Sequence, residues 1–186
     1  MKVSVGISNH HVHLTRIDYE ILFGKKDLSI RNMLNQPGQF SSNEKVTIIG
    51  PKGKLENLVI VGPFRDYTQV EVSKTDSYKL GINPPVRDSG DLNDASVVTI
   101  VGPLGKIEKS CAIIANRHIH VDKNILEKKS LTGYKEVSVR ISGEKSGIIE
   151  HVELKESETA YFEMHLDTDD ANAFLLKNND EVEIIF

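Results

Sequence analysis

One pattern occurs twice in the middle of this chain: it reads EKVTIIGPKGKLENLVIVG at residues 44–62 and SVVTIVGPLGKIEKSCAIIA at residues 96–115. In each copy two runs of β-branched and aliphatic residues flank a Gly-Pro-x-Gly turn, which is the pattern of a β-hairpin. Thr47 and Gly50 of the first copy match Thr99 and Gly102 of the second. This internal repeat predicts two β-hairpins of the same kind.

Strand patterns also dominate the rest of the chain. Apolar and polar residues alternate in VSVGIS, TQVEVS, KEVSVRIS, GIIEHVEL, AYFEMHL and EVEIIF. The chain has no Trp and only 6% aromatic residues, so its core must be packed mainly by Val, Ile and Leu, which favours many short strands. Such strands with frequent turns indicate β-barrels or a sandwich. The lack of βαβ alternation and of a GxGxxG motif argues against a dinucleotide-binding fold.

Helices are expected to be short and to follow strands. Thr15 is a candidate N-cap for RIDYEILF, which Gly24 would end. Asp122 is a candidate cap for KNILEKK, and Thr168 for DDANAFLLK. The segments 28–42 and 83–94 are rich in Pro, Gly, Asn and Ser, and they are predicted to be loops.

The composition argues against several classes of protein. A length of 186 residues suits one large domain or two small ones, and a net charge of −4 gives no basic surface for nucleic acid. No apolar run is long enough to span a membrane. The first residues, MKVSVGISNHHVHL, show neither the apolar core of a signal peptide nor an amphipathic extension, so we expect a cytoplasmic protein. The single cysteine, Cys111, excludes an intramolecular disulfide and is predicted to be a packed core thiol.

Four of the seven histidines occur in two copies of one motif, Asn-x-His-x-His, in SNHHVHL (8–14) and ANRHIHV (115–121). Residues i and i+2 of a strand share a face, so His11 and His13 point the same way, as do His118 and His120. Two imidazoles on one face can chelate a metal ion, and a third ligand from another strand would leave an open position, as in catalytic zinc sites. A lone H-x-H commonly lies on the protein surface and binds no ligand, but two copies in matching sequence favour metal binding. Donors without thiolate suit zinc, and they also admit iron, nickel or cobalt.

A third histidine shares with these motifs a place at the end of a strand. His165 precedes Leu-Asp-Thr, as His13 precedes Leu-Thr and His120 precedes Val-Asp, and each is followed by a predicted helix. Helix N-termini bind anions, so the pattern indicates an anionic substrate such as a phosphate or a carboxylate. His10 and His151 lack this context and are interpreted as ordinary strand histidines.

Two more candidates lie in GPFRDYTQVEVSKTD (62–76). Glu71 shares a strand face with Gln69 and Ser73, and it is either a solvated edge carboxylate or the ligand that completes a metal site. Arg65 offers a planar fork of donors for phosphate or for a developing oxyanion. From the residues alone, a functional role and a purely structural role are about equally favoured for Glu71 and Arg65.

Taken together, the motifs resemble one family. SNHHVHL, QPGQF (36–40), the segment 62–76, LGINPPVRDSGD (80–91), ANRHIHV and MHLDTDDANA run in order through nearly the whole chain, and they are similar to those of the PduL-type phosphotransacylases, also called phosphate propanoyltransferases. The resemblance implies a mainly β fold of two small β-barrels with short capping helices, in which the N-terminal strand joins the C-terminal barrel. It implies one discontinuous barrel from 1–14 plus 112–186, a second from 40–111, and a helix and loop connection at 15–39.

The resemblance also implies a reaction and its site. A short-chain acyl-CoA, propanoyl-CoA or acetyl-CoA, would react reversibly with phosphate to give an acyl phosphate and coenzyme A. Arg65 matches the family's essential arginine. Two zinc ions are implied, and the residues that match their ligands are His11, His13 and Glu71 for one ion and His118, His120 and His165 for the other. No residue is assigned to coenzyme A, and the oligomeric state is left open, a homo-oligomer included. A metal-dependent hydrolase of acyl phosphates or esters and a non-enzymatic metal-binding module are the alternatives.

The chain departs from the family pattern at two points. The first motif usually reads Ser-Asn-Arg-His-Val-His, and His10 replaces that arginine here. Since this side chain is expected to face away from the metal, we predict repacking rather than lost activity. Many members inside bacterial microcompartments carry an amphipathic N-terminal targeting extension, whereas this sequence begins almost at its first strand, which favours the free cytoplasm.

Overall fold

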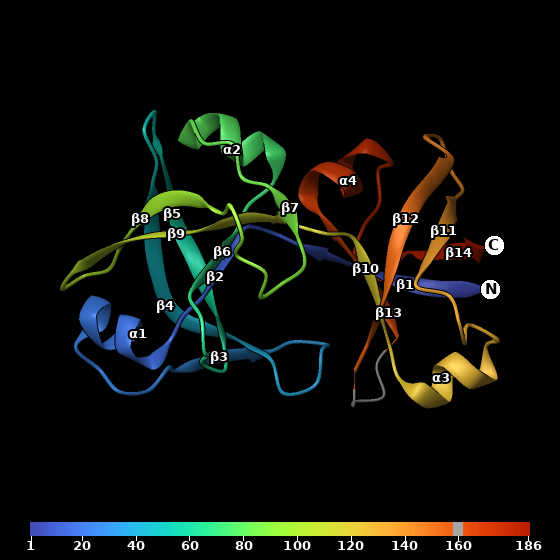
Figure 1. Cartoon of the computed structure of the whole chain (residues 1–186), viewed down its shortest axis with the longest axis horizontal. Helices are drawn as coiled ribbons and strands as arrows, with labels where there is room; N and C mark the ends of the chain where they lie inside the picture. Colours follow the sequence, from blue (N-terminus) through green and yellow to red (C-terminus); the bar gives the residue numbers. More distant parts are fainter. Residues whose placement is uncertain (158–161) are drawn as a thin grey trace. The chain divides into compact units, whose positions relative to one another are not determined.

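The computed structural model describes residues 1–157 and 162–186 (Figure 1). The chain divides into two compact units, one formed by Met1–Ser8 with Asn116–Phe186 and the other by Asn9–Ala115. We call them the C-terminal barrel and the central barrel. The blue N-terminal strand lies among the orange and red strands of the C-terminal barrel (Figure 1), so one unit contains both ends of the described chain.

The C-terminal barrel is a closed ring of strands. β1 pairs in parallel with β13 and in antiparallel fashion with β14, which confirms that the N-terminal strand joins this barrel. Val3 and Val5 of β1 are buried in an aliphatic core with Ile119 and Leu166. Around the ring the order is β1 (Lys2–Ser8), β13 (Glu163–Asp167), β10 (His118–Val121), β12 (Gly147–Glu156), β11 (Glu136–Ile141) and β14 (Glu181–Ile185). The first two residues of the predicted strand AYFEMHL lie outside the described residues.

The central barrel is also a closed ring. It contains β4 (Phe40–Ile49), β5 (Lys54–Gly62), β2 (His11–His13), β6 (Gln69–Glu71), β9 (Lys106–Ala115) and β8 (Ser96–Val101), and β8 closes the ring by pairing with β4. Two short strands extend it, β3 (Ile30–Met33) on β4 and β7 (Val86–Arg87) on β9. A mainly β fold of two barrels is thereby confirmed. Cys111 is buried in the core of this barrel, and burial raises the pKa of its thiol to about 12, as expected for a packed thiol.

The two hairpins predicted from the repeated pattern are β4–β5 and β8–β9. In each turn the first glycine N–H donates to the carbonyl of the second, Gly50 to Gly53 and Gly102 to Gly105, both over 2.9 Å. A Cβ on Gly50 would lie 2.3 Å from the carbonyl oxygen of Leu80. A Cβ on Gly102 would lie 2.5 Å from that of Leu22. These turns therefore require glycine because the end of a helix packs directly onto each of them.

The two rings repeat one arrangement of strands. Starting from the strand that carries H-x-H, the central ring runs β2, β6, β9, β8, β4, β5, and the C-terminal ring runs β10, β13, β1, β14, β11, β12. The parallel and antiparallel pairs follow in the same order around both rings. β1 thus holds in its ring the place that β9 holds in the other, and the two Asn-x-His-x-His motifs stand at equivalent positions.

Short helices follow the strands that carry the candidate residues. α1 (Arg16–Phe23) begins after Thr15 and ends at Gly24, and α3 (Lys123–Lys128) begins after Asp122, both as predicted. α4 (Thr168–Ala173) corrects the prediction: its N-cap is Asp167, whose carboxylate accepts from Asp170 N at 2.8 Å. It ends after one and a half turns, since the chain turns left-handed at Leu175 (φ 58°) instead of continuing to Lys177.

α2 (Lys74–Leu80) was not predicted, although its signals are in the sequence. Ser73 and Asp76 form a reciprocal capping box, and Gly81 in the left-handed region ends the helix. The predicted loops 28–42 and 83–94 likewise contain the short strands β3 and β7. None of the helices in the described ranges is long and apolar enough to cross a membrane.

Candidate metal sites

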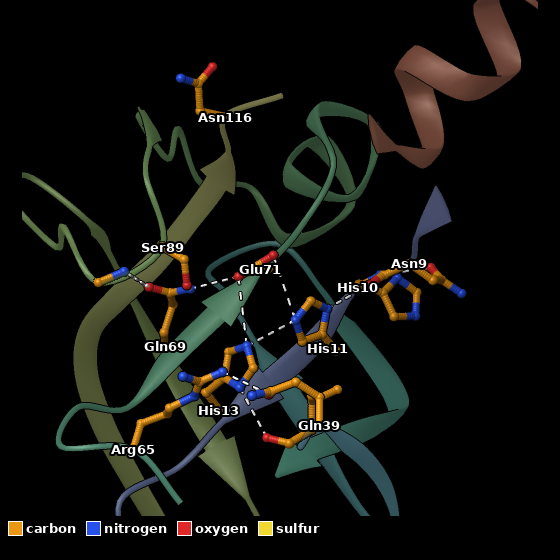
Figure 2. A network of polar contacts seen from close by, with 12 residues as sticks. Asn9, His10, His11, His13, Gln39, Arg65, Gln69, Glu71, Ser89 and Asn116 are labelled. Atoms are coloured by element: carbon orange, nitrogen blue, oxygen red, sulfur yellow. Dashed lines mark hydrogen bonds and ion pairs between the residues drawn. The ribbon is translucent and has the colours of Figure 1, made fainter. Parts of the chain in front are cut away.

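The central barrel brings His11, His13 and Glu71 together. β2 and β6 are antiparallel, with His11 directly opposite Glu71 and His13 opposite Gln69. The two Nε2 atoms lie 3.2 Å apart, and the Glu71 carboxylate oxygens lie 3.6 Å from His11 Nε2 and 3.8 Å from His13 Nε2. Figure 2 shows the three side chains converging from the two strands. Alternation along each strand places them on one face, so the predicted grouping arises from local geometry and register.

Backbone carbonyls orient both imidazoles of this triad. Nδ1 of His11 lies 2.8 Å from the carbonyl oxygen of Asn9, and Nδ1 of His13 lies 3.0 Å from that of Val61. A carbonyl only accepts, so Nδ1 carries the proton and Nε2 presents its lone pair toward Glu71. Burial, together with the neighbouring His11, lowers the pKa of His13 to about 3. His13 is therefore neutral near pH 7, as a metal ligand must be.

Gln69 supports the carboxylate of the same triad. Its side chain is fully buried, and its amide nitrogen donates to Glu71 Oε1 at 2.7 Å and to Ser89 Oγ at 2.9 Å. Its oxygen accepts from the backbone N–H of Gly90 at 2.8 Å. Every polar atom of this amide is thus fixed by a partner, which holds one carboxylate oxygen of Glu71 in place (Figure 2). One signal of this role is visible in the sequence, since Gln69 shares the strand face of Glu71.

Arg65 lies beside His13 in the segment between β5 and β6 (Figure 2). Its Nη2 donates to Gln39 Oε1 at 2.7 Å, and its backbone N–H donates to Leu14 O at 3.0 Å. Its Nε is buried and has no hydrogen-bond partner among the described residues. A buried donor in this state is suited to an oxygen of a bound molecule, and the positive charge favours an anion. Gln39, which sequence reasoning missed, fixes the guanidinium from a distant segment.

The C-terminal barrel brings His118, His120 and His165 together in the same manner. β10 and β13 are antiparallel, and His118 lies opposite His165 as His11 lies opposite Glu71. The Nε2 atoms of His118 and His120 are 3.1 Å apart, and the rings of His120 and His165 have centroids 4.7 Å apart. Nδ1 of His118 lies 2.8 Å from a backbone carbonyl oxygen, that of Asn116. Burial and the neighbouring imidazoles lower the pKa of His120 to about 3.

Among the described residues, these two triads are the groups whose ligand atoms all lie within 4.8 Å of one another. Clustered imidazoles, joined in one triad by a carboxylate, fit a divalent cation such as zinc. The chain therefore contains two histidine-rich candidate metal sites.

Comparison with known proteins agrees with this geometry. The family model described as phosphate propanoyltransferase matches residues 4–177. The phosphate propanoyltransferase of Rhodopseudomonas palustris (strain BisB18) is 44% identical over 185 residues, which is 98% of this chain and 82% of that protein. Those of Thermotoga maritima and Salmonella typhimurium are 44% and 42% identical over 186 and 176 residues, covering 98% and 92% of this chain and 89% and 82% of the relatives.

This chain belongs to the phosphate propanoyltransferase family. The match confirms the resemblance seen in the motifs and the class of enzyme that it implies, a phosphate acyltransferase. Both candidate metal sites and Arg65 lie within the matched residues. That the two triads hold ions, and that Arg65 acts on substrate, stay predictions.

In this chain the residue before each H-x-H has a common structural role. His10 Nδ1 lies 3.0 Å from Asp76 of α2, and Arg117 Nε lies 3.1 Å from Asp170 of α4. Both aspartates are the third residue of the helix that follows the strand carrying the third donor. The interpretation of His10 as an ordinary strand histidine is therefore wrong: it lies outside β2 and ties the motif to α2. His151 is an exposed residue of β12 whose Nδ1 lies 2.9 Å from Glu136.

Proposed function

We propose that this protein catalyses the reversible reaction of a short-chain acyl-CoA, propanoyl-CoA or acetyl-CoA, with phosphate to give an acyl phosphate and coenzyme A. A phosphate oxygen attacks the thioester carbonyl carbon, the carbon–sulfur bond breaks, and the proton released by phosphate balances the thiolate that leaves. The observation that carries the proposal is an oriented His-His-Glu triad beside Arg65, whose buried Nε has no hydrogen-bond partner among the described residues, in a chain of the phosphate propanoyltransferase family.

We propose zinc as the metal at both triads, one ion at each. Bound there, it would supply a Lewis acid that orients phosphate or polarises the thioester carbonyl. His11, His13 and Glu71 would hold one ion, with Gln69 fixing the carboxylate. The other ion would be held by His118, His120 and His165.

Arg65 is assigned to the negative charge of the reaction. Its guanidinium donors would hold the incoming phosphate or the oxyanion that forms when the carbonyl is attacked, and the hydrogen bond to Gln39 limits its rotation before substrate binds. No nucleophilic side chain is required, since phosphate is itself the nucleophile. Cys111 takes no part, because its thiol is buried with a raised pKa.

We propose further that both triads serve one reaction. The support is that the family match runs from residue 4 to residue 177 and so includes both Asn-x-His-x-His motifs. A metal-dependent hydrolase uses water and needs no phosphate as a second substrate. A metal-storage module has no use for an arginine beside the ligands, where its charge opposes that of the ion.

The test follows both products of the reaction of an acyl-CoA with phosphate. Propanoyl-CoA and acetyl-CoA are incubated with phosphate, thiol release is measured with a thiol reagent, and acyl phosphate is trapped as the hydroxamate. We expect equal amounts of thiol and acyl phosphate, no thiol release without phosphate, and rapid release with arsenate in its place. Thiol release that is independent of phosphate and arsenate would indicate a hydrolase and contradict the proposal.

A further inference from the structure

A buried carboxylate adjoins the three-histidine triad of the C-terminal barrel. Glu163 precedes His165 by two residues on β13, and it lies opposite His120 on β10. Only 6% of Glu163 is exposed, and its Oε2 lies 3.0 Å from Nε2 of His165. A carboxylate so deeply buried is costly unless a cation or donors offset its charge, so its position beside a candidate ligand requires an explanation.

Gly6 on β1 leaves the space that this carboxylate fills. Gly6 pairs with His165 in the parallel register of β1 and β13. A Cβ at Gly6 would lie 2.5 Å from Oε2 of Glu163 and 3.2 Å from Cδ2 of His165. Glycine weakens a strand interior and commonly marks a close approach of another group. Any larger residue at this position would displace the carboxylate from its place against His165.

The equivalent positions of the central barrel are different. There Gln69 occupies the place of Glu163 and Ile113 the place of Gly6, because Gln69 lies opposite His13 and Ile113 pairs with Glu71. Gln69 is turned toward Ser89 and Gly90. Each ligand strand thus has one carboxylate on its site face, opposite the first histidine in the central barrel and opposite the second in the C-terminal barrel.

The different positions of Glu71 and Glu163 matter because each carboxylate changes the net charge of its metal site. A divalent cation held by two imidazoles and Glu71 carries one net positive charge, whereas three neutral imidazoles would leave two. A carboxylate charge at Glu163, 3.0 Å from His165, would make the two sites equal in charge. We propose that Glu163 is a positioning residue of the C-terminal metal site, which fixes the His165 ring by direct contact and stabilises the bound cation by its charge. The inference rests on the proposed function, since it needs an ion at this triad.

The experiment measures zinc affinity at the C-terminal site alone. The full chain carrying His13→Ala, which removes a ligand of the central site, is titrated with zinc against a chromophoric chelator of known affinity. Adding Glu163→Gln is expected to weaken binding roughly 10–100-fold, the usual loss when a partner of a metal-binding histidine is removed. Glu163→Asp, which keeps the charge, is expected to recover part of the loss. Gly6→Ala, which keeps every donor, is expected to weaken binding as well.

Glu136→Gln is the matched control, because Glu136 also contacts a histidine nitrogen in the same barrel, His151 at 2.9 Å, but lies on β11, which pairs with neither of the strands that carry the triad. It is expected to leave zinc affinity unchanged. An affinity within twofold of the parent in Glu163→Gln, or an equal loss in Glu136→Gln, would overturn the inference alone. Should Glu163→Gln fail to fold by circular dichroism, Gly6→Ala decides by the same criterion. A parent protein that binds no zinc would instead overturn the proposed metal site, and the inference with it.

Discussion

Replacement of Arg65 by alanine is expected to remove most acyl exchange while the fold and both metal sites remain. The substitution deletes a guanidinium whose Nη2 is held by Gln39 at 2.7 Å and whose buried Nε lacks a partner in the described part of the chain. Losing one donor to a developing oxyanion typically lowers turnover roughly 10²–10³-fold, or about 2.7–4 kcal/mol of transition-state stabilisation. The stability cost is expected to be small, because a partly buried charge, whose buried Nε has no partner among the described residues, is removed at the same time.

The metal is expected to stay bound because the charge of Arg65 is a minor influence on His13. Burial is the main cause of the lowered pKa of His13, followed by the neighbouring His11, whereas Arg65 ranks below both and below the opposing effect of Glu71. Removing the arginine therefore raises the pKa of His13 somewhat but leaves the imidazole neutral near pH 7. A loss of turnover in Arg65→Ala then reports on the reaction and not on metal content.

The assay combines kcat and KM for thiol release with the metal content of the same preparation. Arg65→Lys is expected to recover only part of the activity, since lysine keeps the charge but not the planar fork of donors. Arg31→Ala on the exposed edge strand β3 is the control, with turnover expected to be unchanged. Turnover near that of the unmodified protein in Arg65→Ala, or loss of a metal ion in that variant, would refute the reasoning.

Three further predictions follow from the triads and the hairpins. His13→Ala and His165→Ala should each lose about one metal ion and nearly all turnover, and the double variant should not be multiplicatively worse, because groups acting as a unit are non-additive. If one of them keeps normal exchange without its ion, that site is structural. Gly50→Ala should destabilise the protein by about 1–3 kcal/mol in chemical unfolding, because its Cβ would lie 2.3 Å from the Leu80 carbonyl oxygen; an unchanged midpoint would contradict this. The metal-free protein should lose stability as pH falls from about 6.5 toward 3. In the folded protein His13 and His120 have a pKa of about 3 and stay neutral, whereas in the unfolded chain the same imidazoles become protonated below about pH 6.5. Each should contribute about 2 kcal/mol between pH 7 and pH 5, and replacing either by alanine should flatten the dependence.

Short-range patterns in the sequence were enough to predict the parts of the fold that depend on neighbouring residues. Alternation placed His11 with His13 and His118 with His120, and the Gly-Pro-x-Gly pattern placed both hairpins. The missed helix α2 belongs to the same category, since Ser73 and Asp76 cap it locally and Gly81 ends it. The wrong cap of α4 shows how two adjacent candidates, Asp167 and Thr168, compete for one N-terminus.

Contacts between distant segments could not be predicted from such patterns. The third donor of each triad depends on the register of two strands, which sets Glu71 opposite His11 and His165 opposite His118. Short-range patterns marked His165 at a strand end and left Glu71 with two interpretations, and family resemblance then assigned both residues to the triads. Gln39 is not identifiable as the partner of Arg65 until the chain is folded, because the two are far apart in sequence and joined by a single side-chain hydrogen bond.

The repeated ring explains how the two sites can share a framework and still differ in chemistry. In both barrels an ion pair joins the residue before H-x-H to the third residue of the helix that follows the ligand strand. His10 pairs with Asp76, and Arg117 pairs with Asp170. This ion pair fixes where the motif begins. Strand alternation then places the two histidines, whichever residue forms the ion pair. This is why His10 can stand where the second copy has arginine without moving the histidines. The positions facing the triads are free of that constraint, so the framework admits a carboxylate at Glu71 in one barrel and at Glu163 in the other.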